Sequence, residues 1–588
     1  MKKKTIIILA VIMIFTFLLR VLPYISKVFM DGYVNFYDPD ANYHLRLVEY
    51  MVNNFPHFLT FDPYAIYPDG GVVGYRPVLT FITSGIALLL GGGHPSQHLI
   101  EVIAAWIPPI AGTLLVIPVY FLGKYAFSRT AGIVGAVMVA VMPTELFARS
   151  MLGAFDHHIL EVLFGVCTIL FLVMAYKKDK WWLAIIAGGF LGLYVWNWTG
   201  GMFLAAIIFL WYLVSVYIGD SRPGHVFLCF ATAFLCVIPI LSFSTTKFEW
   251  ALVPMALTPV YFNICHKLAI RDKVPYKLYL AIITLLLAYV FFNIATLSPS
   301  ILVNLKSQFM AIFWGFGSTI MEAQPSSLYV IIYQFGIVAL LAGIGFLVAY
   351  KDKVNPLVLV WSVVLVLAMI GQRRWGYYAT IPLALLGGYT ISRILDNTGK
   401  LYKSAVWVVC AILLIGSLTP GFNSQLRNGP SQYTSWVKAY TWIRDNTPDP
   451  MNNPQDYYKP NPDKKVEYGV LSWWDYGHWC IYYAHRAPLS SNTFQISGSV
   501  GKFLLSQNLE MSEIAIKDLN VKYVVLSADM VKPTGTFYAI YQQIMGTMDG
   551  WEKALPGSMA YNLYTRDELG PWKFVYSVDD IRIYERVN

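Results

Sequence analysis

The sequence predicts a polytopic α-helical membrane protein that carries a carboxyl-terminal mixed α/β domain outside the cytoplasm. Of its 588 residues, 57% are hydrophobic and only 13% are charged, and the mean hydropathy is +0.53. This is far too apolar for a soluble chain of this length. About thirteen apolar stretches of roughly twenty residues, the length that crosses a bilayer, occupy the chain before residue 418.

The first apolar run, from Thr5 to about Pro23, follows three lysines and lacks a small-residue cleavage site, so we expect a retained span with a cytoplasmic amino terminus. Further spans are expected near residues 100–123, 130–147, 158–176, 181–197, 202–218, 226–243, 250–265, 278–297, 329–350, 357–371, 377–392 and 404–418. Because the number of spans is odd, the carboxyl-terminal domain is expected on the side opposite Met1.

Basic residues follow this expected topology. The loops assigned to the inside carry Lys124, Arg129, Lys177, Lys178, Lys180, Arg222, Lys267, Arg271, Lys273, Lys277, Lys351, Lys353, Arg393, Lys400 and Lys403. The short outside loops carry few Lys or Arg residues, which agrees with the bias that orients membrane proteins. The net charge of +9 does not gather into a patch with interleaved aromatics, so we expect no nucleic-acid partner. The six scattered cysteines provide neither a disulfide framework nor a metal-type spacing.

The composition changes after Thr419, where Asn and Pro become frequent and short strand-like runs alternate with helical segments. We therefore predict a transmembrane domain over residues 1–418 and a soluble domain over residues 419–588, which is long enough to fold as a unit. Strands are expected near 466–471 and 521–526, and helices near 432–445 and 500–517.

The loops assigned to the outside contain acidic and histidine residues. Asp38 stands in Asp38-Pro39-Asp40 close behind the first span, where it is either an ordinary turn opener or a carboxylate at the membrane surface. Asp156 precedes an expected helix in Asp156-His157-His158. An Asp at a helix start is often only a cap or a dipole partner. However, Asp-x-His also offers an oxygen and an imidazole to a divalent cation, and His157 competes with His158 for that role.

Two later outside loops carry further candidates. Glu322 closes Thr319-Ile320-Met321-Glu322, behind two glycines, in a loop that is either solvated or a mobile lid able to bring Glu322 over a site. Arg373 and Arg374 lie next to an aromatic-rich turn at the outer surface. They either snorkel at the interface or capture a lipid-borne phosphate, for which the guanidinium fork is well suited.

The most distinctive stretch is Trp473-Trp474-Asp475-Tyr476-Gly477, in the soluble region. Two large aromatics beside an acid and a Tyr-Gly turn can form the wall of a small pocket and place one carboxylate in it. The alternative is a core aromatic pair closed by a turn.

Over essentially its whole length the chain resembles the catalytic subunit of oligosaccharyltransferase, of the single-subunit prokaryotic kind. The pentapeptide Trp473–Gly477 matches the family's signature. Asp38 matches its first-loop acid, Asp156 and His158 match its second acidic motif with Arg149 upstream, Thr319–Glu322 matches its fifth external loop motif, and Arg374 matches its phosphate-binding arginine. The Thr-Ile-x-Glu form leans towards bacteria and the Asp-x-His form towards archaea.

This resemblance implies a GT-C type fold and the transfer of a preassembled glycan from a polyprenyl phosphate or diphosphate to Asn in Asn-x-Ser/Thr, with inversion. It implies a Mn²⁺ or Mg²⁺ ion held by Asp38, Asp156 and His158, with Glu322 as a further candidate, and catalytic roles for Asp38, Asp156 and Glu322. Arg374 and Arg149 would bind the lipid phosphate. The partners would be a lipid-linked oligosaccharide, an acceptor protein and membrane lipids, and the enzyme would act as a single subunit in the cell membrane.

The resemblance also implies that Trp473, Trp474 and Asp475, with Tyr476 and Gly477, recognise the sequon hydroxyl. The family adds a second element, for which Met530 followed by Thr536 fits better than Asp529 with Lys532. Two rivals remain. A protein O-mannosyltransferase would explain the first-loop acids but not the Trp-Trp-Asp pocket. A transporter would place its charges near the middle of the membrane.

Overall fold

The computed structural model describes residues 3–241, 248–272, 324–427, 433–459, 464–493, 498–533, 535–547 and 549–587. The chain divides into two compact units. Unit 1 comprises residues 1–23, 108–151 and 157–428, and unit 2 comprises residues 24–107, 152–156 and 429–588. The predicted domain boundary between residues 418 and 419 stays a prediction.

The described part of unit 1 is helical. Its longer helices are α1 (Lys3–Val21), α6 (Val116–Ala126), α7 (Arg129–Val141), α9 (His158–Lys178), α10 (Trp181–Asn197), α11 (Gly201–Ile218), α12 (Pro223–Val237), α13 (Leu252–Asp272), α17 (Ile337–Lys351), α18 (Pro356–Gly371), α19 (Gly376–Asn397) and α20 (Lys403–Arg427). Shorter elements are α8 (Glu145–Ala148), η1 (Ile238–Ile240), η2 (Phe248–Ala251), α16 (Leu328–Phe335), η4 (Arg373–Trp375) and η5 (Lys400–Tyr402). Helix α5 (Gln97–Leu114) begins in unit 2 and enters unit 1 at Pro108-Pro109.

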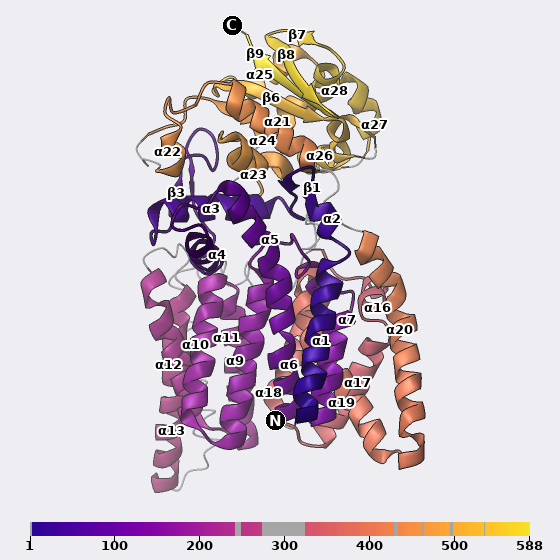
Figure 1. Ribbon diagram of the computed structural model, residues 1–588. Helices are drawn as coiled ribbons and strands as arrows, with labels where there is room; N and C mark the ends of the chain where they lie inside the picture. The colour runs from indigo at the N-terminus through magenta and orange to yellow at the C-terminus, as the bar shows by residue number, and fades with distance from the viewer. Residues whose placement is uncertain are drawn as a thin grey trace. The chain divides into compact units, whose positions relative to one another are not determined.

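Two groups of helices form the interior of unit 1. Helix α10 packs between α9 and α12, and α19 packs against both α7 and α17 (Figure 1). Glycines allow the close approaches: a Cβ on Gly132 would lie 2.4 Å from the backbone oxygen of Tyr120, and one on Gly345 would lie 2.1 Å from that of Leu386. Small residues at helix–helix contacts are typical of membrane proteins. In lipid there is no hydrophobic effect to bring two helices together, so van der Waals contacts between closely packed backbones must stabilise the pair.

The described residues include six helical segments long and apolar enough to cross a membrane: Lys3–Val28, Gln97–Ala126, His158–Lys178, Gly201–Ile218, Pro223–Ile240 and Lys400–Arg427. Helices α16 and α17 make a seventh if this pair, bent by 91°, is one span. Four more apolar helices are shorter. The chain is therefore a multi-pass membrane protein, as predicted, while the expected count of about thirteen spans stays a prediction.

Unit 2 contains a five-stranded sheet. Its order is β5-β6-β9-β8-β7, in which β5 and β6 are parallel and the other neighbours are antiparallel. The strands are β5 (Gly469–Leu471), β6 (Val521–Ser527), β7 (Glu568–Leu569), β8 (Trp572–Val578) and β9 (Ile581–Arg586). The predicted strands near 466–471 and 521–526 correspond to β5 and β6.

Short helices accompany this sheet. They are α21 (Tyr433–Asn446), α22 (Gln455–Tyr458), η6 (Trp474–Tyr476), α23 (Gly477–Trp479), the π-helix η7 (Cys480–Ala484), α24 (Gly498–Leu505), α25 (Leu509–Ala515), η8 (Ala528–Val531), α26 (Thr536–Met545), α27 (Trp551–Ala554), η9 (Leu555–Gly557) and α28 (Met559–Tyr564). The helix predicted near 432–445 is α21. The helical stretch predicted over 500–517 is divided between α24 and α25, because Asn508 caps a new helix by accepting a hydrogen bond from the N–H of Met511.

The first expected loop also folds into unit 2. Its elements are α2 (Ile25–Val28), β1 (Phe29–Met30), β2 (Tyr33–Val34), α3 (Asp40–Asn54), β3 (Phe61–Asp62), β4 (Gly71–Val72) and α4 (Pro77–Leu90). One buried cluster joins Tyr43, Leu47 and Tyr64 of this segment to Tyr457 and Ile481. Inside it, Arg46 is paired with the buried Asp62 at 3.3 Å and lies over the ring of Tyr457. Segments about 400 residues apart therefore share one core.

Candidate functional site

The acidic turn that precedes α3 is fixed by its own hydrogen bonds. Asp38 Oδ1 accepts a hydrogen bond from the backbone N–H of Asp40, at 3.0 Å, where α3 begins. Both carboxylates are half-buried. Acidic groups are favoured at a helix amino terminus, because the exposed N–H groups there carry partial positive charge. The turn thus holds two carboxylates at one end of α3.

The short segment before α9 brings a third carboxylate to the same helix. Asp156 is buried, and its Oδ1 lies 3.1 Å from Nε2 of the buried His44, one turn into α3. The segment is held by backbone hydrogen bonds: Tyr37 donates to the carbonyl of Gly153, and Gly153 donates to that of Ala105. Gly153 has φ +82, and a Cβ there would collide with Val28, so this position requires glycine.

Asp40 faces a second histidine. Its Oδ1 lies 3.1 Å from Nδ1 of the fully buried His478, whose ring is stacked on Tyr43 at 5.1 Å. Burial alone would raise the pKa of Asp40, but His478 more than offsets this, so that the pKa lies below its usual value. On its other side, Nε2 of His478 lies 3.2 Å from Thr493 Oγ1, which is 2.9 Å from the hydroxyl of Tyr75.

The carboxylates of this region affect one another. Burial raises the pKa of Tyr75 well above its usual value, and Asp40, Asp156 and Asp38 raise it further. Burial also raises the pKa of Asp475 to about 7, and Asp38 and Asp40 add to the shift. Asp38 and Asp40 therefore lie close enough to repel the carboxylate of Asp475, and Asp156 lies close enough to repel that of Asp40.

This donor set fits a divalent cation. Carboxylate oxygens are the ligands that Mg²⁺ prefers, and imidazole is acceptable to Mn²⁺ as well. Mutual repulsion among buried carboxylates is costly unless a positive charge or protons compensate it. Among the described residues of this region, the carboxylates carry more negative charge than the two histidines can compensate, and this favours the binding of a cation.

The pentapeptide is built into the core of unit 2. Trp473 is buried, and Trp474 donates from Nε1 to Gln543 Oε1 at 3.1 Å. The ring of Tyr476 is stacked on Trp436 with centroids 4.0 Å apart. A Cβ on Gly477 would lie 2.3 Å from the carbonyl oxygen of Ser490, so only glycine fits. These contacts hold the backbone of Asp475 in place while its carboxyl group remains partly exposed.

The second predicted recognition element lies next to the pentapeptide. The hydroxyl of Tyr476 is 3.2 Å from Thr536 Oγ1. The hydroxyl of Thr536 in turn donates to Asp529 Oδ2 at 2.7 Å. Met530 is fully buried in η8, and Lys532 follows this turn. Asp529 also accepts from the N–H of Thr536, so it caps α26. This gives Asp529 a structural role, and its predicted recognition role remains a prediction.

In unit 1 the two arginines of η4 differ in their partners. Arg373 Nε lies 3.6 Å from Glu145 Oε1, whereas Arg374 donates to the neutral side chain of Gln372 at 2.6 Å. Arg149 directly follows α8, the helix that carries Glu145. The carboxylate of Glu145 compensates the charge of Arg373, so Arg374 is the better candidate for an incoming anion.

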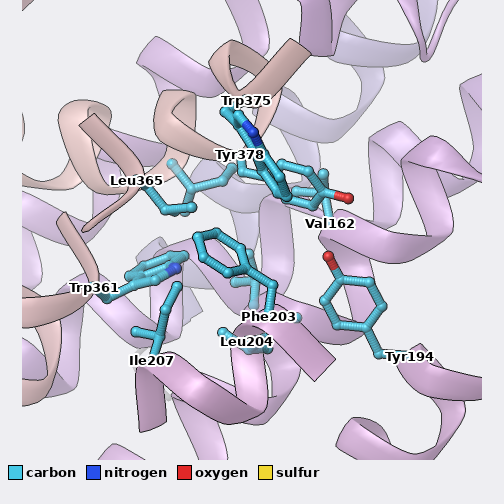
Figure 2. Close-up of a pocket in the computed structure, with 12 residues that line it drawn as sticks. Val162, Tyr194, Phe203, Leu204, Ile207, Trp361, Leu365, Trp375 and Tyr378 are labelled. Atoms are coloured by element: carbon cyan, nitrogen blue, oxygen red, sulfur yellow. The ribbon is translucent and has the colours of Figure 1, made fainter. Parts of the chain in front are cut away.

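An aromatic pocket lies beside η4. It is lined by Val162, Gly165, Val166, Tyr194, Phe203, Leu204, Ile207, Trp361, Leu365, Trp375, Tyr378 and Ile381. Figure 2 shows Trp375 and Tyr378 packed together over Phe203, with Trp361 beside it. The ring centroids of Phe203 and Trp375 are 4.6 Å apart. One of the residues that line the pocket, Trp375, directly follows Arg373 and Arg374 in η4.

Both parts of the chain match families of known proteins. Residues 9–420 match the family described as "Oligosaccharyl transferase STT3, N-terminal", and residues 433–531 match the "AglB core domain". The first match covers more than half of the chain. The chain belongs to the STT3 oligosaccharyl transferase family.

Relatives and solved structures agree with this assignment. The STT3 chain is 27% identical to dolichyl-phosphooligosaccharide-protein glycotransferase 3 of Archaeoglobus fulgidus, over 89% of this chain and 69% of that protein. It is 26% identical to the dolichyl-monophosphooligosaccharide-protein glycotransferase AglB of Haloferax volcanii, over 87% of this chain and 63% of that protein. The apo crystal structure of an Archaeoglobus fulgidus oligosaccharyltransferase superposes with a TM-score of 0.88 at 25% identity, covering 98% of this chain and 80% of that chain.

The predicted GT-C type fold and family are thus confirmed, and the predicted site residues stay predictions. In unit 2 of the STT3 chain, Asp38, Asp156 and Asp475 each lie near Asp40. In unit 1, His157 and His158 lie at the start of α9, and both face Glu161. Glu322, with Thr319 to Met321 and the proposed lid, lies outside the described residues.

Four residues of these clusters were not predicted from the sequence: Asp40, His44, Glu161 and His478. Each had a weak local signal. Asp40 and His44 lie four residues apart on one face of α3, Glu161 follows His157 and His158 at helical spacing, and His478 directly follows the pentapeptide.

Proposed function

We propose that this STT3 chain transfers a glycan from a polyprenyl-phosphate or polyprenyl-diphosphate carrier to the side-chain nitrogen of Asn in Asn-x-Ser/Thr. The observation that carries the proposal is the group of carboxylates around the start of α3 in unit 2, where Asp38 accepts from the N–H of Asp40, Asp40 faces His478 and Asp156 faces His44. Asp475 of the pentapeptide lies close enough for its pKa to be raised by Asp38 and Asp40. These carboxylates can hold a cation, and Asp475 can accept a hydrogen bond from the hydroxyl of the sequon. Relatives named for the same reaction support it.

The amide nitrogen of Asn is a poor nucleophile, because its lone pair is delocalised into the carbonyl and rotation out of plane costs about 18–20 kcal/mol. Asp38 and Glu322 are each proposed to accept a hydrogen bond from one N–H of the amide and thereby to favour localisation of the lone pair on nitrogen. Asp38 is held for this role by the turn before α3. Inversion follows from direct attack of the amide nitrogen on the anomeric carbon: the C–N bond forms as the C–O bond to the phosphate breaks. The phosphate leaves as an anion without protonation by a carboxylic acid, and the nitrogen passes one proton to a neighbouring carboxylate.

Asp38, Asp156 and His158 are the proposed ligands of a Mn²⁺ or Mg²⁺ ion, with Glu322 as a further candidate. When bound, such an ion offsets the negative charge that develops on the departing phosphate. A related archaeal enzyme has been solved with Zn and sulfate, which supports a cation site in the family.

Arg374, assisted by Arg149, is proposed to bind the phosphate of the carrier, and the aromatic pocket beside η4 provides apolar surface for the adjoining isoprenoid units. An Archaeoglobus fulgidus enzyme of the same fold was solved with an inhibitory peptide and a dolichol-phosphate. A lipid phosphate requires both kinds of contact: a guanidinium group for the phosphate and an apolar surface for the isoprenoid chain.

On the acceptor side, Trp473, Trp474 and Asp475 are proposed to recognise the hydroxyl of Ser or Thr, with Met530 as the second element. A site built around a hydroxyl rejects an analogue without it, since its own polar groups are then left without partners. We further propose a cytoplasmic amino terminus, an extracytoplasmic unit 2, residence in the cell membrane and activity as a single subunit. The distribution of Lys and Arg supports this orientation.

The test is to incubate the purified full chain with a lipid extract of the native cells, Mn²⁺ and a fluorescent Asn-x-Thr peptide, and to read the added mass by mass spectrometry. Two control peptides carry Gln in place of Asn or Val in place of Thr. We expect a glycan on the first peptide and neither control modified efficiently.

A hexose attached to Thr in the Gln-x-Thr peptide would instead indicate a protein O-mannosyltransferase and would refute the proposal. Transfer to the Asn-x-Val peptide at the same rate as to Asn-x-Thr would refute the role given to the pentapeptide.

A further inference from the structure

We propose that Glu161, a residue without a role in the function described above, is a positioning residue that fixes the ring orientation and the tautomer of His157 and His158. The inference rests on the proposed function, because it concerns how the predicted ligand His158 is presented to a cation. All the residues involved lie in unit 1.

One oxygen of Glu161 faces both imidazole rings. Nε2 of His157 lies 3.1 Å from Glu161 Oε1, and Nδ1 of His158 lies 3.2 Å from the same oxygen. The spacings of four and three residues bring the three side chains to one face of the first turn of α9. Glu161 is fully buried, whereas the two histidines are partly exposed. The acid thus lies beneath the rings, on the protein side.

The other oxygen of Glu161 is held by α19. Tyr377 donates its hydroxyl to Oε2 at 3.3 Å, and Tyr378 donates to the same oxygen. These tyrosines begin α19 directly after η4. A buried carboxylate is expensive unless it is fully hydrogen-bonded. Here the two hydroxyls and the two rings can satisfy it, so its position is determined by two helices.

The geometry assigns opposite tautomers to the neighbouring histidines. An N–H must point at a carboxylate oxygen, because a lone pair there would be repelled; His158 therefore carries its proton on Nδ1, and His157 on Nε2. The hydroxyl of Tyr377, 3.3 Å from Nδ1 of His158, is a second acceptor for the same N–H. The nitrogens suited to bind a metal are then Nε2 of His158 and Nδ1 of His157.

A carboxylate on the remote nitrogen is the usual support of a metal-binding histidine, because it fixes the tautomer and raises the basicity of the ligating nitrogen. Loss of such a partner typically weakens metal binding 10–100-fold. Glu161 also connects the start of α9 to the helix that follows Arg374. The same residue thereby links the predicted cation ligand to the segment proposed to bind phosphate.

Two measurements on the purified full chain test the role of Glu161. The first is Mn²⁺ affinity, from the EPR signal of free Mn²⁺ during titration. The second is pulsed EPR of the chain loaded with Cu²⁺, which reports the hydrogen bonding of the remote nitrogen of a ligating imidazole. We expect Glu161→Gln to weaken Mn²⁺ binding about 10-fold and to change the remote-nitrogen signal. Glu249→Gln, at a second fully buried glutamate of unit 1, serves as the matched control and should change neither.

A purely structural role for Glu161 would leave the remote-nitrogen signal unchanged. Should Glu161→Gln fail to accumulate, Tyr377→Phe is the milder test and should weaken Mn²⁺ binding a few fold with the same kind of spectral change. If His158→Ala abolishes Mn²⁺ binding while Glu161→Gln retains both affinity and signal, the inference alone is overturned. If Asp156→Ala and His158→Ala both leave Mn²⁺ binding unchanged, the cation site in the proposed function fails and this inference fails with it.

Discussion

The acidic clusters of the two units have opposite ratios of carboxylates to facing hydrogen-bond donors. In unit 2 there are four carboxylates, those of Asp38, Asp40, Asp156 and Asp475, and only two of them face an imidazole: Asp156 faces His44 and Asp40 faces His478. In unit 1, the single carboxylate of Glu161 faces two imidazoles and two tyrosine hydroxyls.

This difference distinguishes carboxylates that can bind a cation or a proton from a carboxylate that orients the side chains around it. A surplus of carboxylates in a partly buried place raises pKa values and favours a cation or a proton. A single carboxylate surrounded by donors is already satisfied, so its remaining effect is to orient those donors. We therefore expect substitutions among the acids of unit 2 to act on the reaction itself, and substitutions around Glu161 to act through the histidines.

The largest expected effect comes from the acids assigned to the amide. Asp38→Ala and Glu322→Ala should each lower the transfer rate by about 10³-fold or more, since each removes a preorganised charged group at the reacting atoms. Turnover of the fluorescent sequon peptide measures this. Asp69→Ala, which removes an exposed acid of unit 2 that lies 3.7 Å from Lys465, is the control and should remain active. Normal turnover in both test variants would contradict the assigned chemistry.

A smaller effect is expected for recognition of the acceptor. Asp475→Asn should raise the KM for an Asn-x-Thr peptide about 10–100-fold, because hydrogen bonds to a charged group contribute roughly 1.5–3 kcal/mol. The rate constant kcat should change much less. Initial rates over a range of peptide concentrations separate the two parameters. A loss confined to kcat would place Asp475 among the reacting groups instead.

The raised pKa of Asp475 has a consequence for stability. Between the ordinary value of 3.8 and the folded value of about 7, the folded chain binds a proton that the unfolded chain does not, so this contribution to stability falls as the pH rises from 4 to 7. Asp475→Asn removes the contribution. The difference in thermal midpoint, variant minus wild type, should therefore grow by a few degrees over that range.

A difference in midpoint that stays constant with pH would show that Asp475 titrates near its ordinary value, and that Asp38 and Asp40 repel its carboxylate less than their positions indicate. Asp69→Ala, measured over the same range, gives the behaviour of an exposed carboxylate.

The smallest effect is expected at Tyr476. Tyr476→Phe removes the hydrogen bond with Thr536 but keeps the stacking on Trp436, and should cost about 1 kcal/mol of unfolding free energy. Acceptor KM should rise no more than a few fold. Tyr538→Phe, at an exposed ring of α26, is the matched control. A loss as large as that of Asp475→Asn would mean that the hydroxyl of Tyr476 itself serves the acceptor.

Local sequence was sufficient for much of the fold. The long apolar runs predict membrane helices such as α9 and α11, because twenty apolar residues suffice to cross a bilayer whatever their neighbours are. Helix α21 and strand β6 were also predictable. The hairpin of β8 and β9 was not predicted, although Asp579-Asp580 between two alternating runs is a turn signal and Asp579 does adopt φ +51.

The sequence by itself determined the family, the membrane class and the pentapeptide, since each depends on residues that are neighbours in the chain. Only the tertiary structure decided which distant side chain each acid faces. Asp156 faces His44, 112 residues away, Asp40 faces His478, and Glu161 faces the tyrosines of α19. Such pairs depend on how distant segments close onto one core, and the free energy of that packing is a property of the whole unit rather than of any local pattern.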